Sequence, residues 1–272
     1  MRKLLKTYMP FARSGLQTAL AYRANFLAWF VGGVMSAFVM YYVWRAVYAA
    51  SGQTDFGGFA MTDMTVFLFV SFLTRFVADS DVSFDVGEEI RDGNVAMRLL
   101  KPARFDMTFL FTELGVESLL VSLVFVPTLA GVELYRFFAC GRVMFHAGYF
   151  ALYLVSLVLC YLFAFYMNLC FGFMAFFLKN LWGFNILKSS ILRFLSGMVI
   201  PFAVLPEGMR VVMEWLPFAS LSYTPVMIYM GKYTGGELAL RLGMQVFWVV
   251  AFYALSQWIL SLAMRHVTVQ GG

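Results

Sequence analysis

Four charged residues stand in largely apolar stretches, and they are the first candidates for chemistry. Glu113 and Glu117 are four residues apart, so they share one face of a helix. A charged residue at the centre of a membrane-spanning helix costs roughly 2.5–3.5 kcal/mol on insertion scales. Such a residue is therefore expected to have an ion-pair partner or a functional role. Arg75 and Arg193 are the candidate partners. One interpretation is a relay for protons or substrate; the other, which we favour, is an interhelical ion pair or a helix that begins later than predicted.

The motifs of nucleotide binding and catalysis are missing from the sequence. No GxxxxGK[ST] phosphate loop occurs, and the only Gly-Lys pair, Gly231-Lys232, is followed by tyrosine. His146 and His266 fall at opposite membrane faces of the predicted topology, which makes a shared zinc site implausible. Three cysteines, an odd number, indicate packing rather than a disulfide framework or a metal site. We therefore expect no catalytic residue, no metal and no cofactor in this chain.

The composition is that of a protein that crosses a membrane several times. Hydrophobic residues make up 62% of the 272 residues and charged residues 13%, against about 45–50% and about 25% in soluble proteins. This excludes a soluble enzyme, a nucleic-acid-binding protein and a disordered scaffold. The apolar runs are continuous rather than alternating, which excludes a β-barrel.

Six apolar stretches are long enough to cross the bilayer as helices. They predict an all-α integral membrane fold with spans at 24–49, 61–79, 106–131, 146–178, 186–205 and 238–264. With the N-terminus inside, most of the 20 Lys and Arg residues fall in cytoplasmic segments, so both termini are predicted to be cytoplasmic. The net charge of +5 follows from this bias and implies no nucleic acid.

The first 23 residues predict an amphipathic helix that lies in the cytoplasmic interface, with its cations near anionic lipid headgroups. Pro10 is expected to kink or restart this helix. A simple anchor ahead of the first span and a role in transmitting motion both remain open.

Residues 80–105 form the polar centre of the sequence. Ser83 or Asp85 can cap a first short helix, and Gly93 can end it. Asn94 can cap a second helical turn before Pro102 stops it. Two short helices on the cytoplasmic side, each with a small apolar face, indicate a docking surface for a soluble partner; an ordinary solvated loop is the alternative.

Four prolines interrupt the sequence after the fifth predicted span: Pro201, Pro206, Pro217 and Pro225. The amphipathic segment 207–216 lies between them. We expect residues 206–235 to form an outer region of helices that dip partway into the membrane, which is tolerated where the backbone is buried in protein or lines a cavity. An outer loop lying flat on the membrane is the alternative.

Seven segments in order carry a resemblance to a known family. They are LAYRANFLAWF (20–30), VWRAVYAA (43–50), GGFAMTDM (57–64), EEIRDGNVAMRLLKP (88–102), SGMVIPFAVLP (196–206), LPFASLSYTPVMIYMG (216–231) and VQGG (269–272). Together they resemble the permease subunits of ABC-2 type transporters, in the six-span branch. The IRxG…LLKP element within 88–102 is the most specific part.

The resemblance implies half of a type V ABC exporter in a bacterial cytoplasmic membrane. A second permease, identical or homologous, would pair with this chain, and a separate ATPase subunit would bind ATP and Mg. The cargo would be a small molecule, a peptide or a lipid. The resemblance places the outer gate near the four prolines and ATPase coupling on the following residues: Phe84, Glu88, Glu89, Ile90, Arg91, Gly93, Arg98, Leu99, Leu100, Lys101 and Pro102.

Two functions of other classes compete with the exporter. One is a membrane scaffold or anchor for a soluble partner. The other is an ion-coupled carrier that uses Glu117 and Arg75. The chain shows no visible internal repeat, which argues against a carrier because such folds usually have one.

Overall fold

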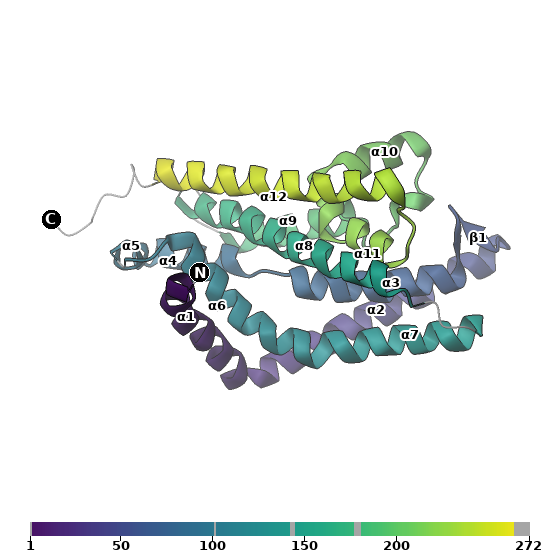
Figure 1. Ribbon diagram of the computed structural model, residues 1–272, viewed down its shortest axis with the longest axis horizontal. Coiled ribbons are helices and arrows are strands. Elements are labelled where there is room, and N and C mark those ends of the chain that lie inside the picture. Colours follow the sequence, from purple (N-terminus) through teal and green to yellow (C-terminus); the bar gives the residue numbers. More distant parts are fainter. Residues whose placement is uncertain (1, 101, 142–144, 177–180, 264–272) are drawn as a thin grey trace.

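The computed structural model describes residues 2–100, 102–141, 145–176 and 181–263. These residues are mostly helical, as predicted, with one small hairpin of strands β1 and β2 (Figure 1). In order the elements are α1 (Arg2–Ala21), α2 (Arg23–Ser51), β1 (Asp55–Phe56), β2 (Phe59–Ala60), α3 (Met61–Ala78), α4 (Val82–Arg91), α5 (Val95–Leu99), α6 (Phe105–Leu120), the π-helix η1 (Val121–Phe125), α7 (Val126–Cys140), α8 (Ala147–Phe173), η2 (Met174–Phe176), α9 (Leu181–Leu195), η3 (Phe202–Val204), α10 (Glu207–Trp215), η4 (Pro217–Leu221), α11 (Tyr223–Tyr229) and α12 (Gly235–Ala263).

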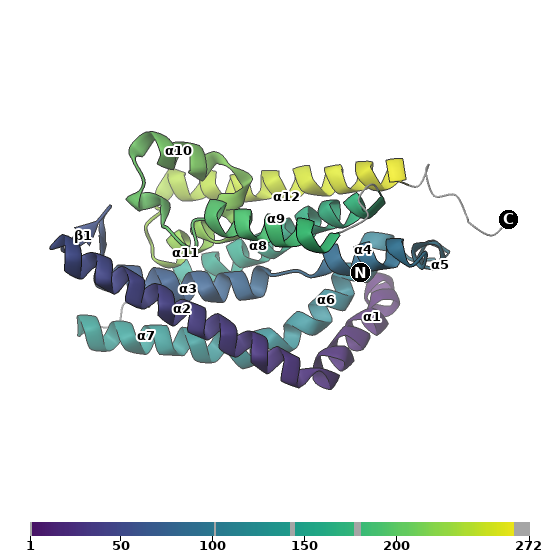
Figure 2. The same ribbon diagram turned by 180° about the vertical axis from the view of Figure 1, so that it is seen from behind.

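Within the described residues, five helical stretches are long and apolar enough to cross a membrane: Arg23–Ser51, Met61–Arg91, Phe105–Cys140, Ala147–Phe176 and Gly235–Ala263. They contain most of five of the six predicted spans. The predicted end of the fourth span, at residue 178, lies outside the described residues. The end of α12, the start of α1, and α4 and α5 lie toward one end of the molecule, and β1 lies at the other (Figures 1 and 2).

The predicted span 186–205 does not form a continuous helix. α9 covers Leu181–Leu195 and is about 22 Å long at roughly 1.5 Å per residue, short of a bilayer of about 30 Å. The helix ends because Gly197 adopts a left-handed φ of 73° and the carbonyl of Ser196 accepts a hydrogen bond from the backbone of Tyr223, at 3.2 Å. The outer region therefore begins ten residues before the predicted boundary.

The predicted end of the third span, residue 131, is also wrong. Its helix continues through η1 into α7 and stops at Cys140, where Gly141 takes a left-handed φ of 66°. Pro127 lies just after η1 and lacks the N–H that would bond four residues back, which accounts for the wider π-turn there. Glu133 and Arg136, predicted to be in the outer loop, form an ion pair on α7 at 2.8 Å.

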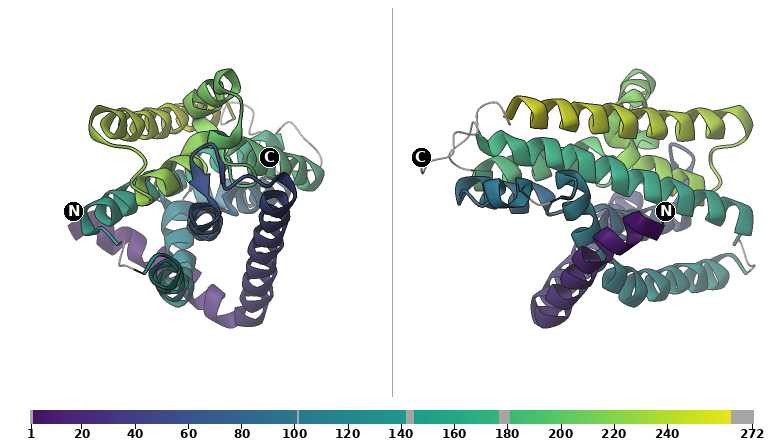
Figure 3. Two further views of the ribbon diagram at one scale, coloured as in Figure 1. Left: turned by 90° about the vertical axis from the view of Figure 1, so that its right-hand side faces the viewer. Right: turned by 60° about the vertical axis from the view of Figure 1, so that its left-hand side comes forward.

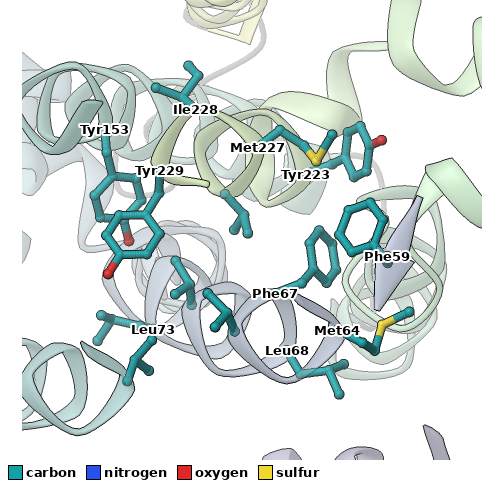
Figure 4. Close-up of a cluster of buried hydrophobic side chains, with 14 of the residues drawn as sticks. Phe59, Met64, Phe67, Leu68, Leu73, Tyr153, Tyr223, Met227, Ile228 and Tyr229 are labelled. Carbon is teal, nitrogen blue, oxygen red and sulfur yellow. The ribbon is translucent and has the colours of Figure 1, made fainter. Parts of the chain in front are cut away.

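The main core surrounds α3. Phe67 on this helix is fully buried and meets the ring of Tyr223 on α11 at 6.0 Å (Figure 4). Tyr153 of α8 closes the other side, and its hydroxyl lies 3.0 Å from the hydroxyl of Thr74. α11 is thus enclosed between α3 and α8, whereas the large apolar residues of α2 and α12 are mainly exposed and available to lipid or another subunit.

α1 runs alongside α6, obliquely to the long helices of the bundle (Figures 1 and 3). The helix continues through Pro10 and does not restart there. Two glycines allow the contact: a Cβ on Gly15 would lie 2.0 Å from the carbonyl oxygen of Thr112, and one on Gly115 would lie 1.9 Å from that of Ala12. The ring of Tyr8 stacks on Phe111 at 5.2 Å. α1 is therefore fixed to the bundle by direct backbone contact.

Candidate functional site

The polar loop folds into a helical hairpin, which we call the coupling hairpin: residues 82–100, comprising α4, the turn at Gly93 and α5. Gly93 has a φ of 76°, which explains why glycine occupies the turn. One stripe of α4, including Val82 and Val86, is fully buried against α8. At the contact, a Cβ on Gly172 would lie only 3.0 Å from Val86. The hairpin thus has a firm attachment to the fourth span.

An internal ion pair closes the coupling hairpin. The guanidinium of Arg98 pairs with the carboxylate of Glu89, donates to the hydroxyl of Thr108 at 2.9 Å and lies 4.0 Å above the ring of Phe109. Glu89 and Arg98 therefore connect α4 and α5 to α6 instead of facing outward. Ile90 is half-buried and packs against the same apolar cluster. Three of the predicted coupling residues thus have contacts inside the chain.

Other predicted coupling residues are free to meet a partner. Leu100 is 86% exposed, and Phe84, Glu88, Arg91, Gly93 and Pro102 are also exposed. The side chain of Leu99 and all of Lys101 lie outside the described residues. Met97 was not among the predicted coupling residues, yet it is 69% exposed. The sequence offered one signal for Met97: it lies three residues before Leu100, in a loop rich in charge. Together Met97 and Leu100 form an apolar tip on a polar hairpin.

A second polar cluster joins three helices where α6 begins. Arg104 donates to Asp106 at 2.8 Å and to the hydroxyl of Tyr253 on α12 at 3.0 Å. Its backbone N–H donates to the hydroxyl of Tyr8 on α1 at 3.0 Å. The pKa of Arg104 is raised above its ordinary value, chiefly by the hydrogen bond to Tyr253 and then by that to Asp106. These contacts link α1 and α12 to the base of the coupling hairpin.

A polar chamber of about 440 Å³ opens where α3, α4, α8 and α9 meet. It contains two of the charged residues that the sequence singled out, Arg75 and Arg193. The charged and amide side chains that line it are Arg75, Asp79, Asp81, Asn168, Asn185, Lys188 and Arg193. Among them Arg75 pairs with Asp79 at 3.6 Å, and the ammonium of Lys188 donates to Asn168 at 2.6 Å.

The expected pairing of the two glutamates with the two arginines is wrong. Both carboxylate oxygens of Glu113 accept hydrogen bonds from the hydroxyl of Ser80, at 2.9 Å. One oxygen of Glu117 is buried without a hydrogen-bond partner in the described part of the chain. Glu113 lies against the connection between α3 and α4, and this bond draws Ser80 toward α6. The two arginines instead line the chamber between α3 and α9.

The different surroundings of the glutamates lead to a paired prediction. Glu113→Met removes the acceptor of Ser80, a loss of roughly 1–3 kcal/mol that lowers the melting temperature by several degrees at about 2–4 °C per kcal/mol. Glu117→Met removes a buried carboxylate oxygen that has no partner, so the melting temperature stays equal or rises. Thermal unfolding of both purified variants in the same detergent tests this. Equal losses in the two variants would show that Glu117 has a stabilising partner.

Each of the four prolines lies at the start of a short helix or directly before it. Pro201 and Pro206 precede η3 and α10, Pro217 starts η4, and Pro225 lies in the first turn of α11. These positions suit proline because the first turn of a helix needs no bonded N–H. All of α11 is buried, whereas α10 has no buried residue. The outer region thus combines one segment inserted between helices with one amphipathic helix at the surface.

Comparison with protein-family models matches residues 34–271 to the family described as ABC-2 family transporter protein. The match includes most of α2 and all helices from α3 to α12, so it covers the coupling hairpin, the polar chamber and the outer region. Among curated proteins no relative matches the chain.

Proposed function

Because this chain belongs to the ABC-2 family of transporter proteins, we propose that it forms half of the translocation pathway of an exporter driven by a separate ATPase subunit. Family membership and the helices of membrane-crossing length make the chain a multi-pass permease. The proposal adds the partner subunit, a second permease, a cytoplasmic location of both termini in a bacterial membrane, and a small molecule, peptide or lipid as cargo.

The coupling hairpin carries the proposal of an ATPase partner. Its base is fixed by burial of Val86 and by the Glu89–Arg98 ion pair, while Met97 and Leu100 are exposed at its tip. Apolar residues presented on a rigid element are suited to a pocket on another protein, because little conformational freedom is lost on binding. ATP bound by the partner can shift the permease only through contacts that differ between two states. The hairpin is the element through which such a difference would reach the spans.

The test is to purify the tagged full-length chain in gentle detergent from its native host and to identify what co-elutes. An ATPase subunit with Walker motifs at near 1:1 stoichiometry is the expected result, together with a second permease if the dimer is mixed. A chain that elutes alone would contradict the proposal. An ATPase that binds while no transport occurs would favour the scaffold function.

A substitution at the tip locates the contact. Leu100→Glu places a charge in the proposed pocket and is expected to raise the dissociation constant for the ATPase roughly tenfold or more, the scale of an interface hot spot. The matched control is Phe138→Glu on α7, which replaces another strongly exposed apolar residue, 76% exposed, on a helix that ends at the opposite end of the molecule. Binding by the purified variants distinguishes them. Equal affinities would place the docking surface elsewhere.

The described structure does not favour the ion-coupled carrier. That function rested on a relay between Glu117 and Arg75, and Arg75 pairs with Asp79 instead.

A further inference from the structure

The polar chamber is lined by more cationic side chains than acidic ones. Arg75, Lys188 and Arg193 face two carboxylates, Asp79 and Asp81. Arg75 contacts Asp79 at 3.6 Å, and the head group of Lys188 bonds to neutral side chains. The guanidinium of Arg193 forms no ion pair or hydrogen bond with any residue that the structure describes. One cation of the chamber is thus available to a ligand.

The two arginines line one chamber from different helices; Arg75 is half-buried and Arg193 is exposed within the chain. Arg75 lies in the last turn of α3, and Arg193 lies in the last turn of α9. An ionisable group of a membrane protein that lies within the apolar part of the bilayer is costly and usually faces a pathway or a partner. Because no acid of the described chain pairs with Arg193, an external anion is the partner that this position lacks.

A buried amide donor supports the same conclusion independently. Asn185 is 1% exposed, and its side-chain nitrogen has no hydrogen-bond partner among the described residues. Its oxygen already accepts from the hydroxyl of Ser83, which in turn accepts from Lys188 at 3.1 Å. The amide is therefore held with its oxygen occupied and its donor free in the chamber wall. A buried donor without an acceptor is costly, and an oxygen of a bound anion would supply the acceptor that this amide lacks.

An apolar groove of about 840 Å³ adjoins the chamber. Trp29, Arg75, Asp79, Arg193 and Met198 line both spaces, which makes them continuous. The remainder of the groove is formed mainly by apolar and small residues of α2 and α3. In Figure 2, α9, α3 and α2 follow one another down the view. A molecule that crosses from one space to the other would need a charged head and an apolar tail.

We propose that the chamber binds the anionic head group of an amphipathic molecule, a phosphate or a carboxylate, whose apolar chain lies in the groove. This inference rests on the proposed transport function and names the class of its cargo. The guanidinium of Arg193 supplies a planar, charged pair of donors to the anion, and the amide of Asn185 supplies a neutral donor. Asp79 and Asp81 also line the chamber, and their carboxylates would repel a ligand that carries a second negative charge outside its head group.

Binding by the full-length chain in dodecyl maltoside tests the site. The probe is dodecyl phosphate, followed by native mass spectrometry, with inorganic phosphate as the head alone and dodecyltrimethylammonium as a tail with a positive head. We expect dodecyl phosphate to bind at least roughly tenfold more tightly than either comparison compound, since a charge-assisted hydrogen bond and tail burial both contribute. Equal binding of the two dodecyl compounds would overturn the proposal.

Substitutions of Arg193 test whether its guanidinium binds the anion. Arg193→Gln is expected to weaken dodecyl phosphate binding roughly tenfold or more, whereas Arg193→Lys, which keeps the charge, retains most of it. Arg45→Gln on the exposed surface of α2 is the matched control and should bind as the unaltered chain does. Because Arg193 makes no ion pair in the described chain, folding is expected to survive, and the melting temperature of each variant verifies this. Unchanged binding by Arg193→Gln would overturn the assignment.

A second arm separates a lipid from a diffusing amphiphile. Nanodiscs of phosphatidylcholine with or without phosphatidic acid report whether the anionic lipid occupies the same site. Dependence on Arg193 for the lipid or for dodecyl phosphate supports the proposal, and dependence for neither overturns it. No ATPase is present in these measurements. Loss of the proposed ATPase partner and loss of the anion site would therefore appear in different experiments.

Discussion

Gly115→Leu is expected to separate α1 from α6 and to destabilise the chain strongly. A Cβ at Gly115 would lie 1.9 Å from the backbone oxygen of Ala12, and the side chain has no alternative direction because the obstacle is backbone. Overpacking a tight contact costs typically 1–3 kcal/mol and more when backbone must move. Roughly 3 kcal/mol or more is therefore expected here, with α1 displaced.

The measurement is thermal unfolding of the purified chain together with limited proteolysis near Tyr22, where α1 meets α2. The matched control is Gly131→Leu on α7, where a new Cβ would meet no atom within 4 Å. Gly131→Leu should gain slightly in helix propensity and lose nothing in packing. A Gly115 variant as stable and as protease-resistant as the Gly131 variant would show that α1 does not depend on this contact. Fixed attachment favours a role for α1 in transmitting motion over that of a simple anchor.

Long apolar runs made four helices predictable. The described bounds of α2, α3, α8 and α12 fall close to the predicted ones because membrane-crossing length and composition are properties of the segment itself. The turn at Gly93 was predictable for a similar reason, since glycine marks a left-handed φ locally.

The ends of two helices depend on distant contacts and were not predictable. α9 stops where Ser196 bonds to Tyr223, far along the chain. The helix after residue 106 passes beyond residue 131 because a π-turn absorbs Pro127, which a pattern of apolar residues does not reveal. In both cases hydropathy identified the segment and tertiary structure set its boundary.

In the candidate site, too, the sequence identified residues but not their contacts. The sequence identified two charged residues of the chamber, Arg75 and Arg193, and several of the coupling hairpin, because charge in an apolar chain is conspicuous. It paired the two arginines with Glu113 and Glu117 wrongly, since spacing gives a helix face but not the neighbouring helix. Glu113 meets Ser80, and Arg98 meets Glu89 from a separate helix. Asn185 carried no sequence signal, because its free donor exists only once α4 and α9 pack together.

Arg241→Gln is expected to release the outer region from α12. Arg241 is 8% exposed, forms an ion pair with the carboxylate of Glu214 on α10, and donates to the backbone oxygen of the same residue at 3.2 Å. Removing one partner leaves a mostly buried carboxylate without its main charge, which costs about 3–5 kcal/mol in buried pairs. A lower melting temperature and faster proteolysis within 206–222 are the expected measurements.

Arg210→Gln is the matched control for this pair, since Arg210 approaches the same carboxylate of Glu214. That contact is 3.9 Å long and its arginine side chain is 41% exposed, so its loss should cost about 0–1 kcal/mol. The double variant Arg241→Gln with Glu214→Gln should recover part of the loss, because no unpaired charge remains. If Arg241→Gln costs no more than Arg210→Gln, α10 is held by its apolar face alone. If it costs far more, as the geometry indicates, one buried pair fixes the outer helix to the last span, and movement of α12 is transmitted directly to the segment around the four prolines.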